Sequence, residues 1–122
     1  MLKIKIFLCL SLSLLFVACG KEEKSEAQIL QERINHGKSL YKRECIVCHG
    51  AMAEKSYMGE VPPIKDLGSD ARLEMMKQYK EGTLGKKGVY GLAELKKDVM
   101  IKLSERDMQD IDLYIKEITG EK

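Results

Sequence analysis

Two cysteines and one histidine carry the most specific chemistry in this 122-residue chain. Cys45 and Cys48 lie three positions apart, and His49 follows the second cysteine directly. This is the spacing of covalent haem attachment, because each thiol can add to one vinyl group of a porphyrin while the adjacent imidazole binds its iron. The pattern therefore predicts one covalent haem c, with His49 as an axial iron ligand.

Paired cysteines at this spacing also occur in two other kinds of site. A zinc site needs a second pair of ligands, and the remaining candidates are His36 and two N-terminal cysteines, Cys9 and Cys19. A redox dithiol of the thioredoxin type needs a βαβ context, but no segment with the period of a strand flanks the motif. A metal site and a disulfide remain the alternatives to haem attachment.

The N-terminal residues have the pattern of an export signal. Two lysines precede an apolar run over residues 6–18, which is as long as a signal-peptide core and short for a membrane span. The run ends at Cys19 in a sequence that resembles the bacterial lipobox. We expect a signal peptide over residues 1–18, cleaved before Cys19, whose lipid would anchor the protein to a membrane in the periplasm. Phe16 stands where the lipobox usually has leucine, so simple cleavage and an uncleaved anchor helix are alternatives.

The charge of the mature chain argues against a nucleic-acid partner. The full chain has 21 Lys and Arg against 19 Asp and Glu, and residues 1–18 contain two of the lysines and no acidic residue. The mature protein would therefore be near neutral, and it has no basic block interleaved with aromatic residues. Its length predicts one domain, and with no tryptophan such a chain would gain stability by enclosing a large apolar cofactor.

Three segments have the period of amphipathic helices, and none alternates convincingly with the period of a strand. They are predicted over residues 28–43, 70–81 and 104–120. A charged segment before them, residues 19–27, is expected to be a tether, so that the domain covers residues 28–120.

Residues at the ends of these segments are typical of helix caps. Ser69 or Asp70 can cap the start of the second helix, and Gly82 can end it in a left-handed conformation. Ser104, with Asp107 three positions later, predicts a capping box for the third helix, which Gly120 would end.

Four segments together resemble a small class I bacterial cytochrome c, namely residues 37–41, 45–50, 61–64 and 103–115. The resemblance implies an all-α class I cytochrome c fold, with three main helices and loops wrapped around one covalent haem c. It also implies that the first and last helices cross closely at Gly37, with Tyr41 and Tyr114 packed around the crossing.

The resemblance further assigns the surroundings of the iron. Pro62 would accept a hydrogen bond from the second ring nitrogen of His49 through its carbonyl. A methionine in the loop before the last helix would be the sixth ligand. Met100 is preferred and is expected to lie in that loop, although it precedes Ser104 by four residues where the family spacing is longer. Lys96, eight residues before Ser104, is the alternative, and an open site is a third possibility.

Two functional classes follow. The first is an electron carrier with redox proteins as partners and no small-molecule substrate, because no nucleophile, base and orienting group occur together and an enzyme is not expected. The alternative is a haem-based ligand-binding or sensor protein with an open or weakly held sixth position.

Overall fold

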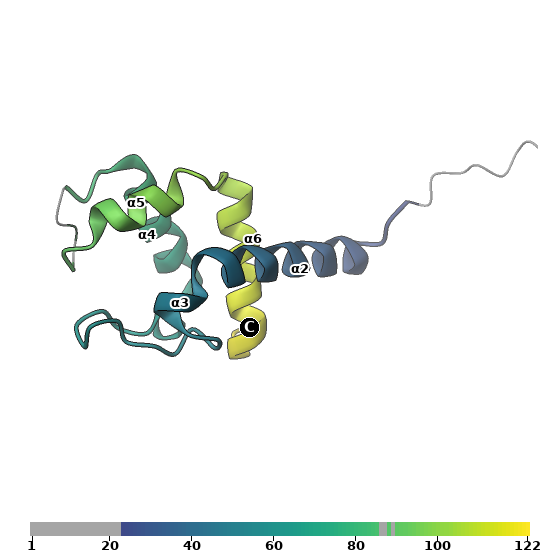
Figure 1. The fold of residues 1–122 in the computed structure, drawn as a ribbon. Helices are drawn as coiled ribbons and strands as arrows, with labels where there is room; N and C mark the ends of the chain where they lie inside the picture. Colours follow the sequence, from purple (N-terminus) through teal and green to yellow (C-terminus); the bar gives the residue numbers. More distant parts are fainter. Residues whose placement is uncertain (1–22, 86–87, 89) are drawn as a thin grey trace, which may run out of the picture.

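The computed structural model describes residues 23–85, 88 and 90–122, which form helices and loops without a β-strand (Figure 1). The elements are α2 (Glu26–Glu44), α3 (Ile46–His49), the short 3-10 helix η2 (Ile64–Asp66), α4 (Ser69–Glu81), α5 (Ala93–Met100) and α6 (Glu105–Thr119). The predicted all-α class is confirmed. The expected signal peptide and Cys19 lie outside the described residues, and so does the tether up to residue 22.

The start of α2 corrects the boundary predicted between tether and domain. The Ser25 hydroxyl accepts a hydrogen bond from the Gln28 amide, and the Gln28 side chain accepts one from the Ser25 amide at 2.9 Å. This capping box makes residues 26 and 27 helical, although they were assigned to the tether. The first half of α2 extends beyond α6 (Figure 1), so Leu30 on the predicted apolar stripe remains 47 % exposed.

The second half of α2 crosses α6, and Gly37 lies at the point of contact. A Cβ atom placed on Gly37 would lie 1.8 Å from the carbonyl oxygen of Asp110, so only glycine allows the two backbones to approach this closely. The rings of Tyr41 and Tyr114 pack beside the crossing with centroids 5.4 Å apart. The crossing predicted at Gly37 is confirmed.

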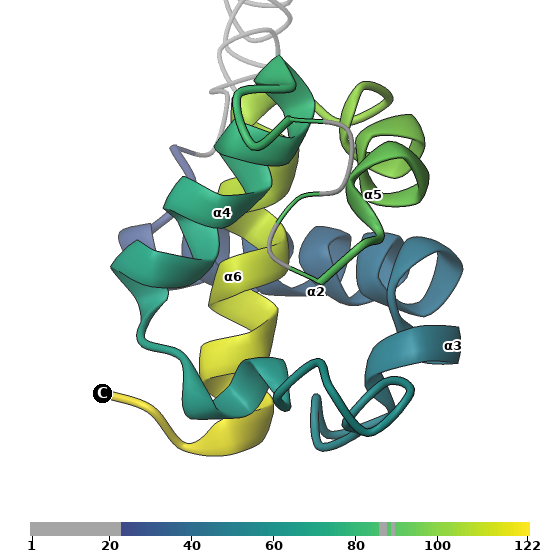
Figure 2. The same ribbon diagram turned by 90° about the vertical axis from the view of Figure 1, so that its left-hand side faces the viewer.

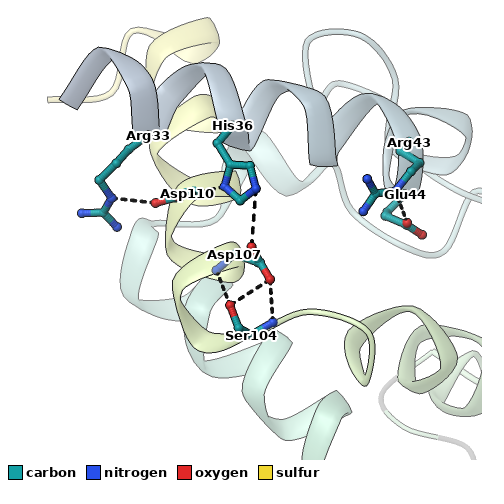
Figure 3. Close-up of polar contacts among 7 residues, drawn as sticks. All are labelled: Arg33, His36, Arg43, Glu44, Ser104, Asp107 and Asp110. Carbon is teal, nitrogen blue, oxygen red and sulfur yellow. Dashed lines mark hydrogen bonds and ion pairs between the residues drawn. The ribbon is translucent and has the colours of Figure 1, made fainter. Parts of the chain in front are cut away.

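Polar side chains surround the same crossing (Figure 3). Arg33 Nε donates to the buried carboxylate of Asp110 at 2.6 Å, and His36 Nδ1 lies 3.0 Å from its other oxygen. His36 Nε2 also faces Asp107, which closes the predicted capping box with Ser104. His36, a candidate zinc ligand in the sequence, instead pairs with the acidic residues of α6.

The packing of α4 against α6 depends on a buried arginine. Arg72 is 3 % exposed; its Nε donates to Asp112 at 2.7 Å and its Nη2 donates to Glu121 at 2.6 Å. Ser69, predicted as a possible cap of α4, is instead its first residue and donates its hydroxyl to Asp112, while Gly68 takes the cap position without a side-chain bond. A tertiary hydrogen bond of Ser69 therefore replaced the local cap.

Helix α5 is an element that the sequence analysis placed in a loop. It lies beside α4 (Figure 2), it begins after Leu92 without a side-chain cap, and its only buried residue is Ala93. A helix of eight residues without a cap has a weak local signal. The expectation that Met100 lies in a loop was wrong, because Met100 is the last residue of α5.

The caps predicted at the other helix ends are confirmed. Gly82 and Gly120 end α4 and α6 with φ of 72° and 71°. Within the described part of the chain, no helix combines the length and the apolar character that crossing a membrane requires.

Replacing Gly37 with alanine tests the crossing. We expect Gly37→Ala to lower the free energy of unfolding by about 1–3 kcal/mol or more, because the new methyl group would overlap the α6 backbone. Gly68→Ala is the matched control: nothing lies within 4 Å of a Cβ there, and the loss should stay below about 1 kcal/mol. Equal denaturant midpoints for the two variants would contradict the close approach.

The ion pair of Glu121 predicts a pH-dependent contribution to stability. The hydrogen bond from Arg72 holds the pKa of Glu121 below its ordinary value of 4.5, so its contribution is complete above about pH 4.5 and disappears as the pH falls through the folded-state value. Glu121→Gln should therefore lower the free energy of unfolding at pH 7 by less than about 1 kcal/mol, because the side chain is partly exposed.

The difference between wild type and Glu121→Gln should shrink as the solution is acidified below pH 4.5, because the wild-type carboxyl is then also neutral. Glu117→Gln, an exposed position on α6, is the control. A Glu121→Gln difference that stays constant from pH 7 to pH 3 would show that the charge of Glu121 is unimportant.

Candidate functional site

The cysteine and histidine motif lies at the end of α2 and on α3. Cys45 ends α2, with its amide donating to the Tyr41 carbonyl at 2.9 Å, and α3 follows immediately from Ile46 to His49. Gly50 then turns the chain with φ of 83°, and its carbonyl accepts a hydrogen bond from the buried Tyr41 hydroxyl at 2.7 Å. The α2–α6 crossing therefore fixes the position of α3 through Tyr41.

Cys45 and His49 form part of the wall of an apolar cavity. Its empty space, counted together with the open space at its mouth, is about 740 Å³. The opposite walls come from the loop before α4, from α4 itself and from α5 and α6; among the apolar lining residues are Val61, Pro62, Ile64, Leu67, Met75 and Met76. A second hollow of about 530 Å³ shares Cys45 and His49 and adds Cys48.

The His49 imidazole is buried in a form suited to binding a metal. Burial, together with the charge of Lys96, lowers the pKa of His49 to about 4, so the ring is neutral at pH 7. Its Nδ1 makes no hydrogen bond within the described structure. A neutral imidazole at the wall of an apolar cavity can donate one ring nitrogen to the iron of a porphyrin. The unpaired Nδ1 is the atom left for a second bond of the ring, since buried polar atoms normally have partners.

The hydrogen bond predicted between His49 and the Pro62 carbonyl is absent from this structure. Pro62 lines the same cavity as His49, but the Nδ1 atom that would donate has no partner. The sequence therefore placed Pro62 on the same cavity as His49, but the predicted hydrogen bond between them is not formed.

The Cys45 thiol does not have the lowered pKa of a reactive cysteine. Cys45 and Cys48 are both free, and burial, with the nearby Glu44 and Cys48, raises the pKa of Cys45 to about 12. Reactive cysteines have lowered pKa values, because the thiolate is the nucleophile. The described residues also contain no group of three or more His, Cys, Asp or Glu side chains able to hold a metal ion, and Cys9 and Cys19 lie outside them.

Both candidates for the sixth ligand reach this site from α5. Lys96 and Met100 line each of the two hollows, and their spacing of four places them on the same face of the helix. Lys96 is partly buried, and its Nζ lies 4.7 Å from the centre of the Tyr79 ring and 5.9 Å from that of Tyr90. Burial lowers the pKa of Lys96.

Five residues of the cavity lining were not predicted from the sequence to lie there. Tyr79 and Tyr90 flank Lys96, and the buried Arg72 reaches the cavity wall from α4. Met75, with its neighbour Met76, was assigned to core packing, and both also line the cavity. The helical period placed the methionines on α4, but which face of α4 meets the cavity depends on its ion pairs with α6.

Comparison with known proteins gives one match. A family model described as Cytochrome c matches residues 34–119, a range that begins in α2 and ends with α6 and includes the whole cavity wall. No curated protein and no solved structure matches the chain.

Proposed function

Because the chain belongs to the cytochrome c family, we propose that it is a periplasmic electron carrier, anchored to a membrane through a lipid on Cys19. The family binds haem c covalently and carries out haem-based electron transfer, and a single haem is typical of a domain of this size. The location and the anchor are the parts of the proposal that rest on the N-terminal sequence alone.

We assign the two thioether bonds to Cys45 and Cys48 and the proximal iron bond to His49. The observation that carries this assignment is the position of these three residues along α3 and its N-cap, with Cys45 and His49 at the wall of the apolar cavity, Cys48 at the adjoining hollow and the imidazole neutral. When bound, haem c supplies a one-electron ferric and ferrous couple.

The residues of the chain contribute rigidity and a dry environment. The short link from α2 to α3 and the bond between Tyr41 and Gly50 hold His49 in place. Apolar side chains along the cavity limit the access of water, which helps to set the reduction potential of a bound redox centre. The charge of Arg72 at the cavity wall is compensated by Asp112 and Glu121, so it does not stand unpaired in the interior.

The cavity favours electron transfer over catalysis. Its described lining has a neutral histidine, thiols placed for haem attachment, methionines and a lysine, but no nucleophile hydrogen-bonded to a base and an orienting group. We therefore propose that the protein exchanges electrons with other redox proteins and does not transform a small-molecule substrate.

Covalent haem binding is tested on the exported and matured protein. We expect a pyridine haemochrome spectrum of a haem with two thioether bonds and a mass increased by one haem. Cys45→Ser and Cys48→Ser should each remove one thioether bond and shift the haemochrome band, and the double variant should hold no covalent haem. A colourless wild-type protein with the mass of the bare chain plus lipid would refute the proposal.

Anchoring is tested separately through Cys19. The wild-type protein should sediment with membranes and carry a lipid mass on Cys19, whereas Cys19→Ala should lack this lipid and its haem content per chain should be unchanged. Fractionation and mass spectrometry of the mature N-terminus provide the measurement. Mature wild-type protein that is water-soluble and unmodified at Cys19 would disprove the anchor without affecting the haem assignment.

A further inference from the structure

We propose that Lys96, and not Met100, is the sixth ligand of the haem iron. This inference rests on the proposed haem site and concerns the one position that the sequence left open. An amine at this position would distinguish the protein from carriers that use a thioether, because it is a harder donor and does not favour ferrous iron in the same way.

The first argument is the position of the Lys96 side chain. It lies in the middle of α5 and lines both hollows that contain His49. A long, flexible stem allows an amine to reach an internal site from the edge of a helix. Lys96 and His49 thus face the same cavity from α5 and α3.

The second argument is that the Lys96 ammonium has no opposite charge beside it. Its only hydrogen-bond partner among the described residues is the Tyr79 hydroxyl, at 3.5 Å, and it forms no ion pair there, unlike Lys24 with Glu32. Two tyrosine rings flank the amine instead. The tyrosine faces attract the ammonium but supply no counter-charge, and burial lowers the pKa of Lys96. Loss of the proton, which gives the form that can donate a lone pair, is therefore easier than for an exposed lysine.

The third argument concerns what Met100 already does. Met100 is partly buried and packs against the core cluster that contains Leu103 and Ile111. It is also the last residue of α5, so its position depends on the turn into α6. Its thioether therefore has an apolar environment without iron, whereas the Lys96 amine has only weak partners.

Binding through Lys96 is chemically balanced. The ammonium releases one proton to solvent, and the nitrogen lone pair of the resulting amine forms the bond to iron. No oxidant, reductant or further reactant is required, and no bond of the chain is broken.

The test uses the haem-loaded mature protein and its absorption and electron paramagnetic resonance spectra at neutral pH. We expect a low-spin ferric wild type without the far-red charge-transfer band of thioether-ligated iron. Met100→Leu should leave this spectrum unchanged, whereas Lys96→Met should produce the thioether band and raise the midpoint potential. Lys97→Met is the matched control: it is an exposed lysine of the same helix that does not line the haem cavity, and its substitution should change neither property.

Lys96→Ala adds a second readout, because it should open the iron to rapid binding of carbon monoxide in the reduced protein. If this variant does not fold, Lys96→Met still decides the question, since it keeps a long side chain. A thioether band in the wild type that disappears in Met100→Leu would overturn the inference in favour of Met100. A high-spin wild type that binds carbon monoxide at once would overturn it in favour of an open site.

These outcomes remain separate from a failure of the proposed function. The same samples give a pyridine haemochrome spectrum, which reports covalent haem whichever residue is the sixth ligand. Absence of haem would refute the proposed function, whereas haem with a thioether or an open sixth position would refute only the assignment to Lys96.

Discussion

The close approach of two helix backbones at Gly37 is the constraint on which the rest of the structure depends. The Asp110 carbonyl of α6 occupies the space that the side chain of any residue type other than glycine would need at position 37 of α2. This contact lets Tyr41 and Tyr114 pack beside the crossing and brings Arg33 to the buried Asp110. Both helices contribute residues to the core cluster, so the close approach at Gly37 sets the distance between α2 and α6 within that core.

The candidate haem site follows from the same crossing. Helix α2 leads into α3 without a loop, and the Tyr41 hydroxyl bonds to Gly50 on the far side of the motif. The thiols and the imidazole are therefore attached to the most firmly packed part of the molecule. Rigid support of this kind suits a redox centre, whose geometry should change little between its two oxidation states.

Ion pairs position the opposite wall of the cavity, whereas close backbone contact positions the wall that carries the motif. Arg72 joins α4 to α6 through Asp112 and to the C-terminal residues through Glu121. Helix α5 then packs on α4 and carries Lys96 and Met100 to the cavity. The residues opposite His49 thus depend on a series of tertiary contacts.

Local chemistry let the sequence alone predict much of this protein. The motif at Cys45, Cys48 and His49, the caps at Ser104 and Gly120 and the need for glycine at Gly37 all arise from residues close together in the chain or from one residue type without a substitute. These features gave the helical class, the family resemblance and the proximal side of the candidate site.

Only the tertiary structure decided the distal side. Helix α5 has no capping side chain, so its stability comes from packing on α4, and a sequence pattern does not record that packing. The pairing of Arg72 with Asp112 joins residues 40 positions apart. The burial of Lys96 between two tyrosines likewise depends on where α4 and α5 meet. Such contacts depend on how the helices are arranged in space. A local sequence pattern shows which residues lie on one helix, but it does not show which distant side chain each of them will meet.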